Sequence, residues 1–94
     1  MQAVDGGYKY CPVGNAKLVL LSFGVKITKD VKGVSVPIFT LPDNVRASNP
    51  WRFRVTNSTE GDIDGNLVSF ADPTGNAERQ WNGTALIFTT LYIA

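Results

Sequence analysis

Residues 17–28, Lys-Leu-Val-Leu-Leu-Ser-Phe-Gly-Val-Lys-Ile-Thr, alternate in the way that decides the fold class. Successive side chains of a β-strand point to opposite faces, so residues two apart share a face. One face of this segment is apolar throughout and consists of Val19, Leu21, Phe23, Val25 and Ile27. The other face is apolar at Leu18 and Leu20 and becomes polar later. The segment therefore predicts one long strand that packs on a core.

The rest of the chain has the composition of short strands joined by turns. Val, Ile and Thr supply about a quarter of the residues, and Gly and Pro are spread throughout, which disfavours helices. The predicted strands are 17–28, its hairpin partner 34–40, then 51–56, 66–70 and 84–93. The polar stretches 41–50 and 57–65 are predicted as loops. Because Pro37 cannot donate to a strand ladder, the strand 34–40 is expected at an edge or with a bulge.

These patterns predict an all-β fold. We expect a small antiparallel β-sandwich or barrel of about six to eight short strands, jelly-roll-like and without significant helix. Residues 1–14 are less regular and are interpreted as an N-terminal connector or edge segment from a longer parent chain. Residues 15–94 are interpreted as the sandwich or barrel domain itself.

The segment 84–93, Thr-Ala-Leu-Ile-Phe-Thr-Thr-Leu-Tyr-Ile, is apolar on both faces. A strand has this composition when both of its faces are covered. A chain of 94 residues has a thin core, with one face of each sheet packed on it, so a second subunit is a natural cover. We therefore expect a symmetric oligomer. The alternative is that 17–28 and 84–93 are central strands of a tight two-sheet sandwich with covering loops.

Composition excludes several classes of function. The chain has no histidine and a single cysteine, Cys11, which removes the usual catalytic triads, Cys/His zinc sites and any intrachain disulfide. The formal net charge is +1, so no strong field attracts nucleic acid or an anionic membrane. No apolar run approaches the ~20 residues of a membrane helix. We expect no enzymatic activity, no cofactor, no metal, no nucleic-acid partner and no membrane insertion.

Two groups of polar residues predict a saccharide site. Trp81 stands in the turn-like segment 78–83, where an indole is either a lid on the core or a flat platform for a sugar ring. Trp51, which follows Pro50, is expected in the core. Hydroxyl groups both donate and accept hydrogen bonds, so a sugar needs Arg, Asn and Asp nearby. The candidate saccharide-binding residues are Trp81, Arg52, Arg54, Asp62, Asp64, Arg79 and Asn82.

Alternatives remain open for the charged members of this set. Arg52 and Arg54 share one face of the strand 51–56, and guanidinium groups bind phosphate or vicinal hydroxyls in bidentate fashion. The arginines could instead form a solvated face paired with Asp62 or Asp64. The two aspartates could form a solvated acidic loop or a cation site, but they lack the EF-hand spacing. A glycosidase pair of carboxylates has no support in the surrounding sequence.

Residues 34–55, Val-Ser-Val-Pro-Ile-Phe-Thr-Leu-Pro-Asp-Asn-Val-Arg-Ala-Ser-Asn-Pro-Trp-Arg-Phe-Arg-Val, carry a resemblance. They are similar to the C-terminal head domains of receptor-binding proteins from tailed bacteriophages of Gram-positive hosts. Leu41-Pro42 and Arg46 keep the pattern of such heads, whereas Val45 and Ala47 stand where an aromatic residue and a proline are common. The resemblance covers about residues 17–94, and the segments 64–68 and 89–94 fit the middle element and the terminal strand.

The resemblance implies a fold, a function and partners. Such heads are homotrimeric β-barrels or sandwiches at the tip of a tail fibre or baseplate, so a location on the virion, acting outside the host cell, is expected. They bind host cell-wall saccharide, often phosphorylated polysaccharide or teichoic acid, and adhere by avidity without catalysis. Other tail or baseplate proteins are expected as further partners. The alternative function is a structural trimerisation or capping module of a viral fibre or baseplate that binds no ligand.

Overall fold

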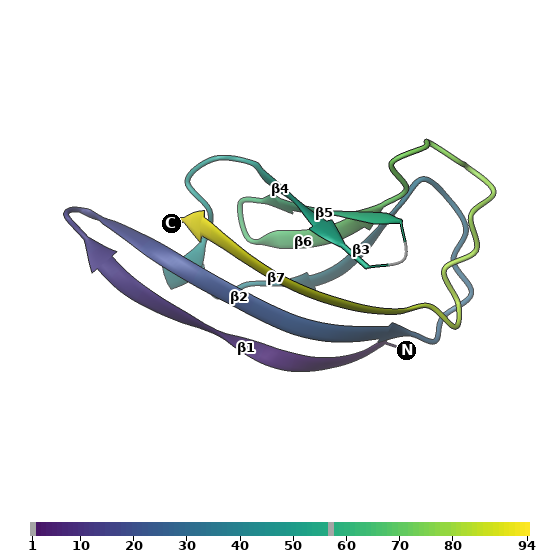
Figure 1. The fold of residues 1–94 in the computed structure, drawn as a ribbon, viewed down its shortest axis with the longest axis horizontal. Helices are drawn as coiled ribbons and strands as arrows, with labels where there is room; N and C mark the ends of the chain where they lie inside the picture. Colours follow the sequence, from purple (N-terminus) through teal and green to yellow (C-terminus); the bar gives the residue numbers. More distant parts are fainter. Residues whose placement is uncertain (1, 57) are drawn as a thin grey trace.

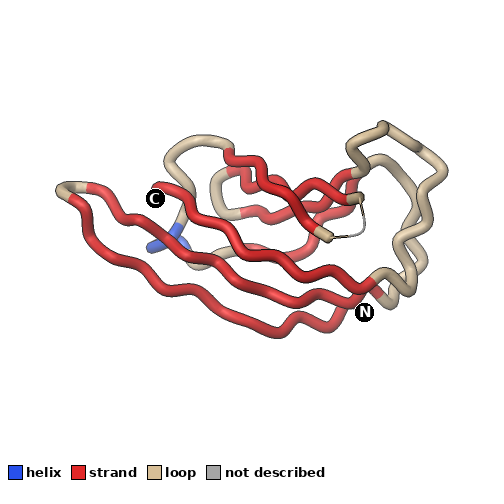
Figure 2. The backbone as a smooth tube through the Cα atoms, viewed as in Figure 1, coloured by secondary structure: helices blue, strands red, loops and turns tan. Residues whose placement is uncertain are grey.

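The computed structural model describes the backbone of residues 2–56 and 58–94, and the side chains of residues 6–56 and 58–94. Seven strands form two antiparallel sheets that face each other (Figure 1). The strands are β1 (Gln2–Val13), β2 (Ala16–Ile27), β3 (Ser35–Thr40), β4 (Trp51–Val55), β5 (Thr59–Asp64), β6 (Leu67–Ala71) and β7 (Ala85–Ile93). Within the described ranges the one helical segment is a 3₁₀ turn, η1 (Asp43–Val45), drawn in blue in Figure 2. The predicted small all-β sandwich is confirmed.

The first sheet has the strand order β1-β2-β7 and the second the order β3-β6-β5-β4. In the second sheet, β4, β5 and β6 are successive neighbours, and β3 reaches the far side of β6 through a long connection. This arrangement is a Greek key. A complete jelly roll contains eight strands and two Greek keys, and the present sandwich shares its layered form. No helix in the described part of the chain is long and apolar enough to cross a membrane.

The strand β1 forms a hairpin with β2 along its full length. The register runs from Gln2 opposite Ile27 to Val13 opposite Ala16, and two residues, Gly14 and Asn15, make the turn. Gly14 has a φ of +61°, the positive value that two-residue hairpin turns use. The described part of the predicted connector or edge segment 1–14 is therefore the edge strand of the first sheet.

The core lies between the two sheets. The side chains of Val19, Leu21, Val25 and Ile27 are buried, as the alternation in 17–28 predicts. Phe88 of β7 faces them from the next strand and is the centre of an aromatic cluster with Phe53, Phe70 and Phe23, at ring-centroid distances of 4.8, 5.7 and 6.0 Å. Gly61 of β5 leaves room for this cluster, because a Cβ there would lie against the ring of Phe53.

Two predictions about the strands are wrong. First, β3 is not the hairpin partner of β2, because its apolar residues Val36 and Ile38 cover the core from the opposite sheet, beside β6. Second, the described part of the predicted loop 57–65 contains the strand β5, while Asn57 lies outside the described residues. The expectation for Pro37 is confirmed, because β3 is an edge strand whose register shifts between Pro37 and Phe39.

The outer face of the first sheet is apolar and uncovered in the single chain. Ile87 and Leu91 of β7 are 68% and 50% exposed, and Leu18, Leu20 and Ile93 are also exposed. The alternative that loops cover both faces of β2 and β7 is therefore wrong for the single chain. In the middle of this face, the hydroxyls of Ser22 and Thr89 lie 3.1 Å apart and bond to each other. Both hydroxyls would therefore keep a hydrogen-bond partner if another surface covered this face.

Candidate functional site

The outer face of the second sheet carries four charged side chains on two neighbouring strands. The register sets Arg52 of β4 opposite Asp62 of β5, and Arg54 opposite Glu60. Along β5 the residues alternate, with Thr59, Gly61 and Ile63 buried and Glu60, Asp62 and Asp64 between them. This alternation puts the carboxylates on the side away from the core. We call Arg52, Arg54, Glu60 and Asp62 the charged face.

A hollow lies over one end of the charged face. Its volume is about 580 Å³, within the ~300–1,000 Å³ that is usual for ligand sites. The residues that line it come from β4, from the start of β5 and from the turn after β6: Arg52, Phe53, Arg54, Val55, Ser58, Thr59, Glu60 and Pro73. The hollow is therefore built by the strand pair β4–β5 rather than by a single loop.

The charged residues on this face do not neutralise one another through direct contact. Among residues 6–56 and 58–94, whose side chains are described, the ion pairs are Lys32 with Glu78 and Arg79 with Asp72, and neither includes a member of the charged face. In the alternative of a solvated face, Arg52 or Arg54 pairs with Asp62 or Asp64. The described residues contain no such ion pair. The guanidinium donors and carboxylate acceptors therefore remain available to a ligand.

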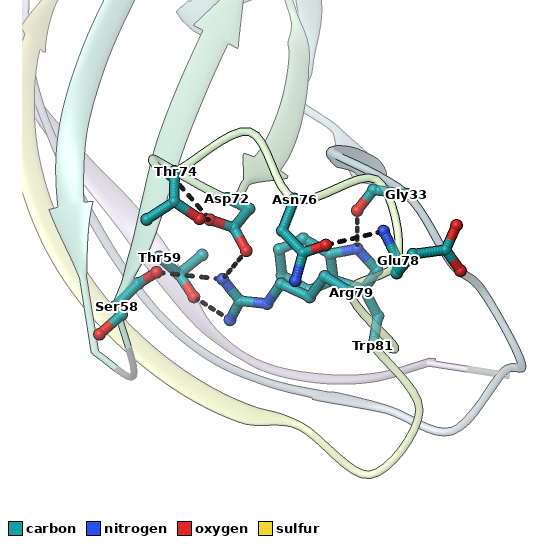
Figure 3. A network of polar contacts seen from close by, with 9 residues as sticks. All are labelled: Gly33, Ser58, Thr59, Asp72, Thr74, Asn76, Glu78, Arg79 and Trp81. Atoms are coloured by element: carbon teal, nitrogen blue, oxygen red, sulfur yellow. Dashed lines mark hydrogen bonds and ion pairs between the residues drawn. The ribbon is translucent and has the colours of Figure 1, made fainter.

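Arg79 contacts Ser58 and Thr59, two residues that line the hollow, and is engaged by the protein itself (Figure 3). Its guanidinium donates to the carbonyl oxygen of Ser58 at 3.0 Å and to Oγ1 of Thr59 at 2.6 Å, and it pairs with Asp72 at 3.5 Å. Its side chain is only 15% exposed, and its guanidinium lies 4.1 Å from the ring centroid of Trp81. Arg79 therefore fixes the wall of the hollow, and its predicted role as a direct ligand contact is not supported by this geometry.

Trp81 is fully buried, with 0% of the residue exposed. Its Nε1 donates to the carbonyl oxygen of Gly33 at 3.0 Å, and its backbone N–H donates to the carbonyl oxygen of Val31 at 2.9 Å. These two hydrogen bonds hold Trp81 against the 31–33 segment, with its indole in the core. The prediction of a sugar-stacking platform is therefore wrong, and the alternative, a lid on the core, is correct.

The other tryptophan is also placed differently from the prediction. Trp51 was expected in the core but is 44% exposed, and its Nε1 donates to Oγ1 of Thr90 at 2.9 Å. It begins β4 at the border between the two sheets, so one edge of the indole meets β7 and the remainder meets solvent. The apolar alternation of Trp51, Phe53 and Val55 is real, but the strand end is too close to the rim for full burial.

The structure brings together only part of the predicted set. Arg52, Arg54 and Asp62 belong to the charged face, and Asp64 lies on the same side at the far end of β5. Asn82 lies elsewhere and donates to Asp30 at 2.8 Å. The residues that the sequence reasoning missed at the hollow are Ser58, Thr59, Glu60 and Pro73. The period-two alternation from Thr59 to Asp64 is the signal that could have revealed this strand and its outward carboxylates.

Asp72 gives the wall of the hollow a dependence on pH. The hydroxyl and the backbone N–H of Thr74 donate to Asp72 Oδ1 at 2.6 and 2.8 Å, and these bonds, with the charge of Arg79, hold the pKa of Asp72 below its ordinary value. A lowered pKa stabilises the folded protein above about pH 4, and this contribution is lost as the pH falls through the folded-state pKa.

We therefore expect the Asp72→Asn variant to lose less stability on acidification than the wild type. Urea unfolding at neutral pH and near pH 2.5 measures the fall in unfolding midpoint for both proteins. The variant removes the carboxylate but keeps an acceptor oxygen for Thr74. The difference between the wild type and the variant in how far the unfolding midpoint falls therefore reports the titration of Asp72 alone. An equal fall in both proteins would contradict the assignment.

The charged face offers donors and acceptors side by side. Each arginine has five N–H donors in a planar fork, and each carboxylate only accepts. Neighbouring hydroxyl groups, which donate and accept through adjacent oxygens, match such an arrangement. In the described part of the chain, no group of three or more Cys, Asp or Glu residues is placed to hold a metal ion. No protein-family model, no curated protein and no solved structure matches the chain.

Proposed function

We propose that this chain is a non-enzymatic binding module that recognises saccharide on a host cell surface through the charged face. The observation that carries the proposal is the hollow over β4 and β5, where Arg52, Arg54 and Glu60 line about 580 Å³. These side chains form no ion pair with one another among the described residues. The same chemistry is what the resemblance to phage receptor-binding heads implies.

The composition of the hollow fits a sugar better than an apolar ligand. The hydroxyl group of Ser58 and the carboxylate of Glu60 lie beside the two arginines, so both donors and acceptors are present. Thr59 is buried and its Oγ1 accepts from Arg79, so it supports the wall of the hollow. Pro73 adds a small apolar surface on which the CH groups of a sugar ring can pack. A phosphate on the glycan would be bound by the guanidinium forks of Arg52 and Arg54. Phosphorylated polysaccharide and teichoic acid are therefore the first ligands to test.

A second candidate function is favoured by the apolar outer face of the first sheet. Leu20, Ile87 and Leu91 are exposed there, and a contiguous apolar surface of this kind marks an assembly site in many proteins. In this alternative the chain is a trimerising or capping module of a viral fibre or baseplate, and the charged face binds nothing. Both candidates carry over from the resemblance a homotrimer on the virion tail tip, with other tail proteins as partners.

Nuclear magnetic resonance titration distinguishes the two candidates. Purified cell-wall polysaccharide and teichoic acid are added to ¹⁵N-labelled protein, with neutral dextran as the control polymer. We expect amide shifts to concentrate in 52–55, 58–62 and 72–75 and to leave β1 and the outer face of β7 unchanged. The polysaccharide recovered afterwards should keep its length, since no hydrolysis is proposed. Shifts that cluster elsewhere, or none up to millimolar sugar, would favour the structural module.

A further inference from the structure

The outer edge of β1 presents unpaired backbone groups. Lys17 exchanges both backbone hydrogen bonds with Ala94, and Ile27 donates to Thr84, so the odd-numbered residues of β2 bond to β7 and its neighbours. The even-numbered residues of β2 therefore bond to β1, because the two sides of a strand alternate in an antiparallel ladder. By the β1–β2 register, the odd-numbered residues of β1 take these bonds. The N–H and C=O groups of Gly6, Tyr8 and Tyr10 point outward.

The opposite edge of the same sheet is covered. The backbone N–H of Ile87 donates to Oγ1 of Thr56 at 3.1 Å, and the carbonyl oxygen of Ile93 accepts from the N–H of Ser48 at 3.0 Å. By contrast, every described side chain of β1 is exposed, and Figure 1 shows β1 with no strand beyond it. Natural sheets usually protect long edges with charge, proline or a bulge. In β1, Pro12, which lacks an N–H, lies near the end of the strand, and the charged positions Asp5 and Lys9 carry opposite signs.

We propose that β1 pairs in antiparallel fashion with β1 of a second copy of this chain, about a twofold axis at Gly7. In this register Gly6 lies opposite Tyr8 of the second copy, and Val4 lies opposite Tyr10. The backbone groups of these four positions point outward, so about eight backbone hydrogen bonds form across the axis. Pro12 lies opposite Gln2, at the end of the paired segment, where its missing N–H interrupts no inner hydrogen bond.

The sequence of β1 favours this register over its neighbours. It sets Lys9 opposite Asp5 of the second copy, and opposite charges directly across two strands stabilise the pair. An axis at Lys9 would instead set two lysines opposite each other. An axis at Tyr8 would set Pro12 opposite Val4 inside the paired segment, and the outward carbonyl oxygen of Val4 would then lack a donor because proline has no N–H. The register about Gly7 is therefore the one that pairs opposite charges and also keeps all inner backbone hydrogen bonds.

Gly6 gives the pairing a further specific contact. It has a φ of +144°, and a Cβ there would lie 2.7 Å from the Cα of Phe23, so the position cannot carry a side chain of its own. Tyr8 of the second copy would lie directly across and cover the bare backbone, as aromatic residues do for edge glycines. Tyr8 and Tyr10 are both exposed in the single chain and are available for this contact.

The pairing goes beyond the proposed function and competes with the homotrimer carried over from the resemblance, so the mass of the assembly decides between the two. Two three-stranded sheets would join into one continuous sheet, and their apolar outer faces would lie side by side. One strand edge accepts one partner edge, so the assembly closes at two copies. The charged face lies on the other sheet and stays open in the pair.

Disulfide cross-linking tests the register. Gly7→Cys in a Cys11→Ser background places the two introduced thiols at a pair without mutual hydrogen bonds, where Cα atoms lie ~4.5 Å apart, within reach of a disulfide. A Cβ at Gly7 meets nothing within 4 Å, so the fold tolerates the change. The matched control is Val13→Cys in the same background, which is exposed on the same strand but lies far from its counterpart in the second copy. We expect Gly7→Cys to cross-link at least ~10-fold faster under mild oxidation. Equal rates would overturn the register.

The solution mass of the wild-type protein tests the pairing without any substitution. Light scattering over a range of concentrations should give twice 10.2 kDa. Lys9→Glu should shift the mass toward one chain, and the exchange of both charges, Asp5→Lys with Lys9→Asp, should restore it. A mass of three chains, or of one chain at millimolar concentration, would overturn the pairing. Either result leaves the saccharide titration unaffected, so the two proposals fail separately.

Discussion

Trp81→Ala is expected to lower the free energy of unfolding by about 3–5 kcal/mol, the cost of removing a fully buried large aromatic side chain. Trp81 is the largest fully buried side chain of the protein, and it donates to Gly33 while the Arg79 guanidinium lies over its ring. A domain of this size is stable by roughly 5–14 kcal/mol in total. The substitution would therefore remove a large part of the stability, and with it the wall of the hollow.

Urea unfolding followed by far-ultraviolet circular dichroism measures this effect. Trp51→Ala is the matched control, because it removes the same side chain from a site that is 44% exposed. We expect the control to lose about 1 kcal/mol, mainly the hydrogen bond to Thr90. If Trp81 were a platform for sugar, its variant would unfold at the wild-type urea concentration and lose only saccharide binding.

The double variant Arg52→Gln with Arg54→Gln is expected to weaken saccharide binding by at least ~100-fold. Hydrogen bonds that involve a charged group contribute ~1.5–3 kcal/mol each, and one such bond is lost at each arginine. The unfolding midpoint should stay nearly unchanged, because both side chains are exposed and surface substitutions usually change stability by less than ~0.5 kcal/mol. Isothermal titration calorimetry with the polysaccharide that shifts the amides of 52–55 measures the affinity.

The control for net charge is Lys26→Gln with Lys29→Gln. These lysines are exposed at the end of β2 and just beyond it, so the double change removes the same charge from outside the lining of the hollow. We expect binding to stay within about twofold of the wild type, because exposed charges that do not contact the ligand are largely screened by salt. An equal loss in both double variants would show that overall charge, rather than the charged face, governs binding.

The sequence predicts those strands in which apolar and polar residues alternate clearly. Residues 17–28 and 84–93 form β2 and β7 with ends shifted by at most one residue, because the first has an unbroken apolar face and the second is largely apolar on both faces. The strand β5 was missed because its inward positions are Thr59, Gly61 and Ile63, of which only the last is a large apolar residue. Gly61 is small there because the ring of Phe53 occupies the space, and a single sequence does not display that constraint.

The candidate site, like the strands, could be predicted from the sequence only in part. Arg52 and Arg54 could be grouped from the sequence because they lie two residues apart on one strand. Their neighbours on the charged face, Glu60 and Asp62, depend on the β4–β5 register and thus on a strand that was not predicted. Arg79 and Trp81 were assigned to the site because polar turns are usually exposed, but contacts with Gly33 and Thr59 draw them inward. Such contacts join residues far apart in the sequence, and local patterns do not contain them.

The pairing of β2 with β7 has a consequence for how the chain is made. Leu18 lies opposite Ile93, so the central ladder of the first sheet joins residues from nearly opposite ends of the chain. Folds dominated by such distant pairs acquire their native structure slowly. During synthesis the β1–β2 hairpin can form once residue 27 has left the ribosome, but the other edge of β2 has no strand to pair with until β7 follows. The nascent chain therefore exposes an unpaired strand edge while residues 28–93 are made, and such edges are prone to aggregate.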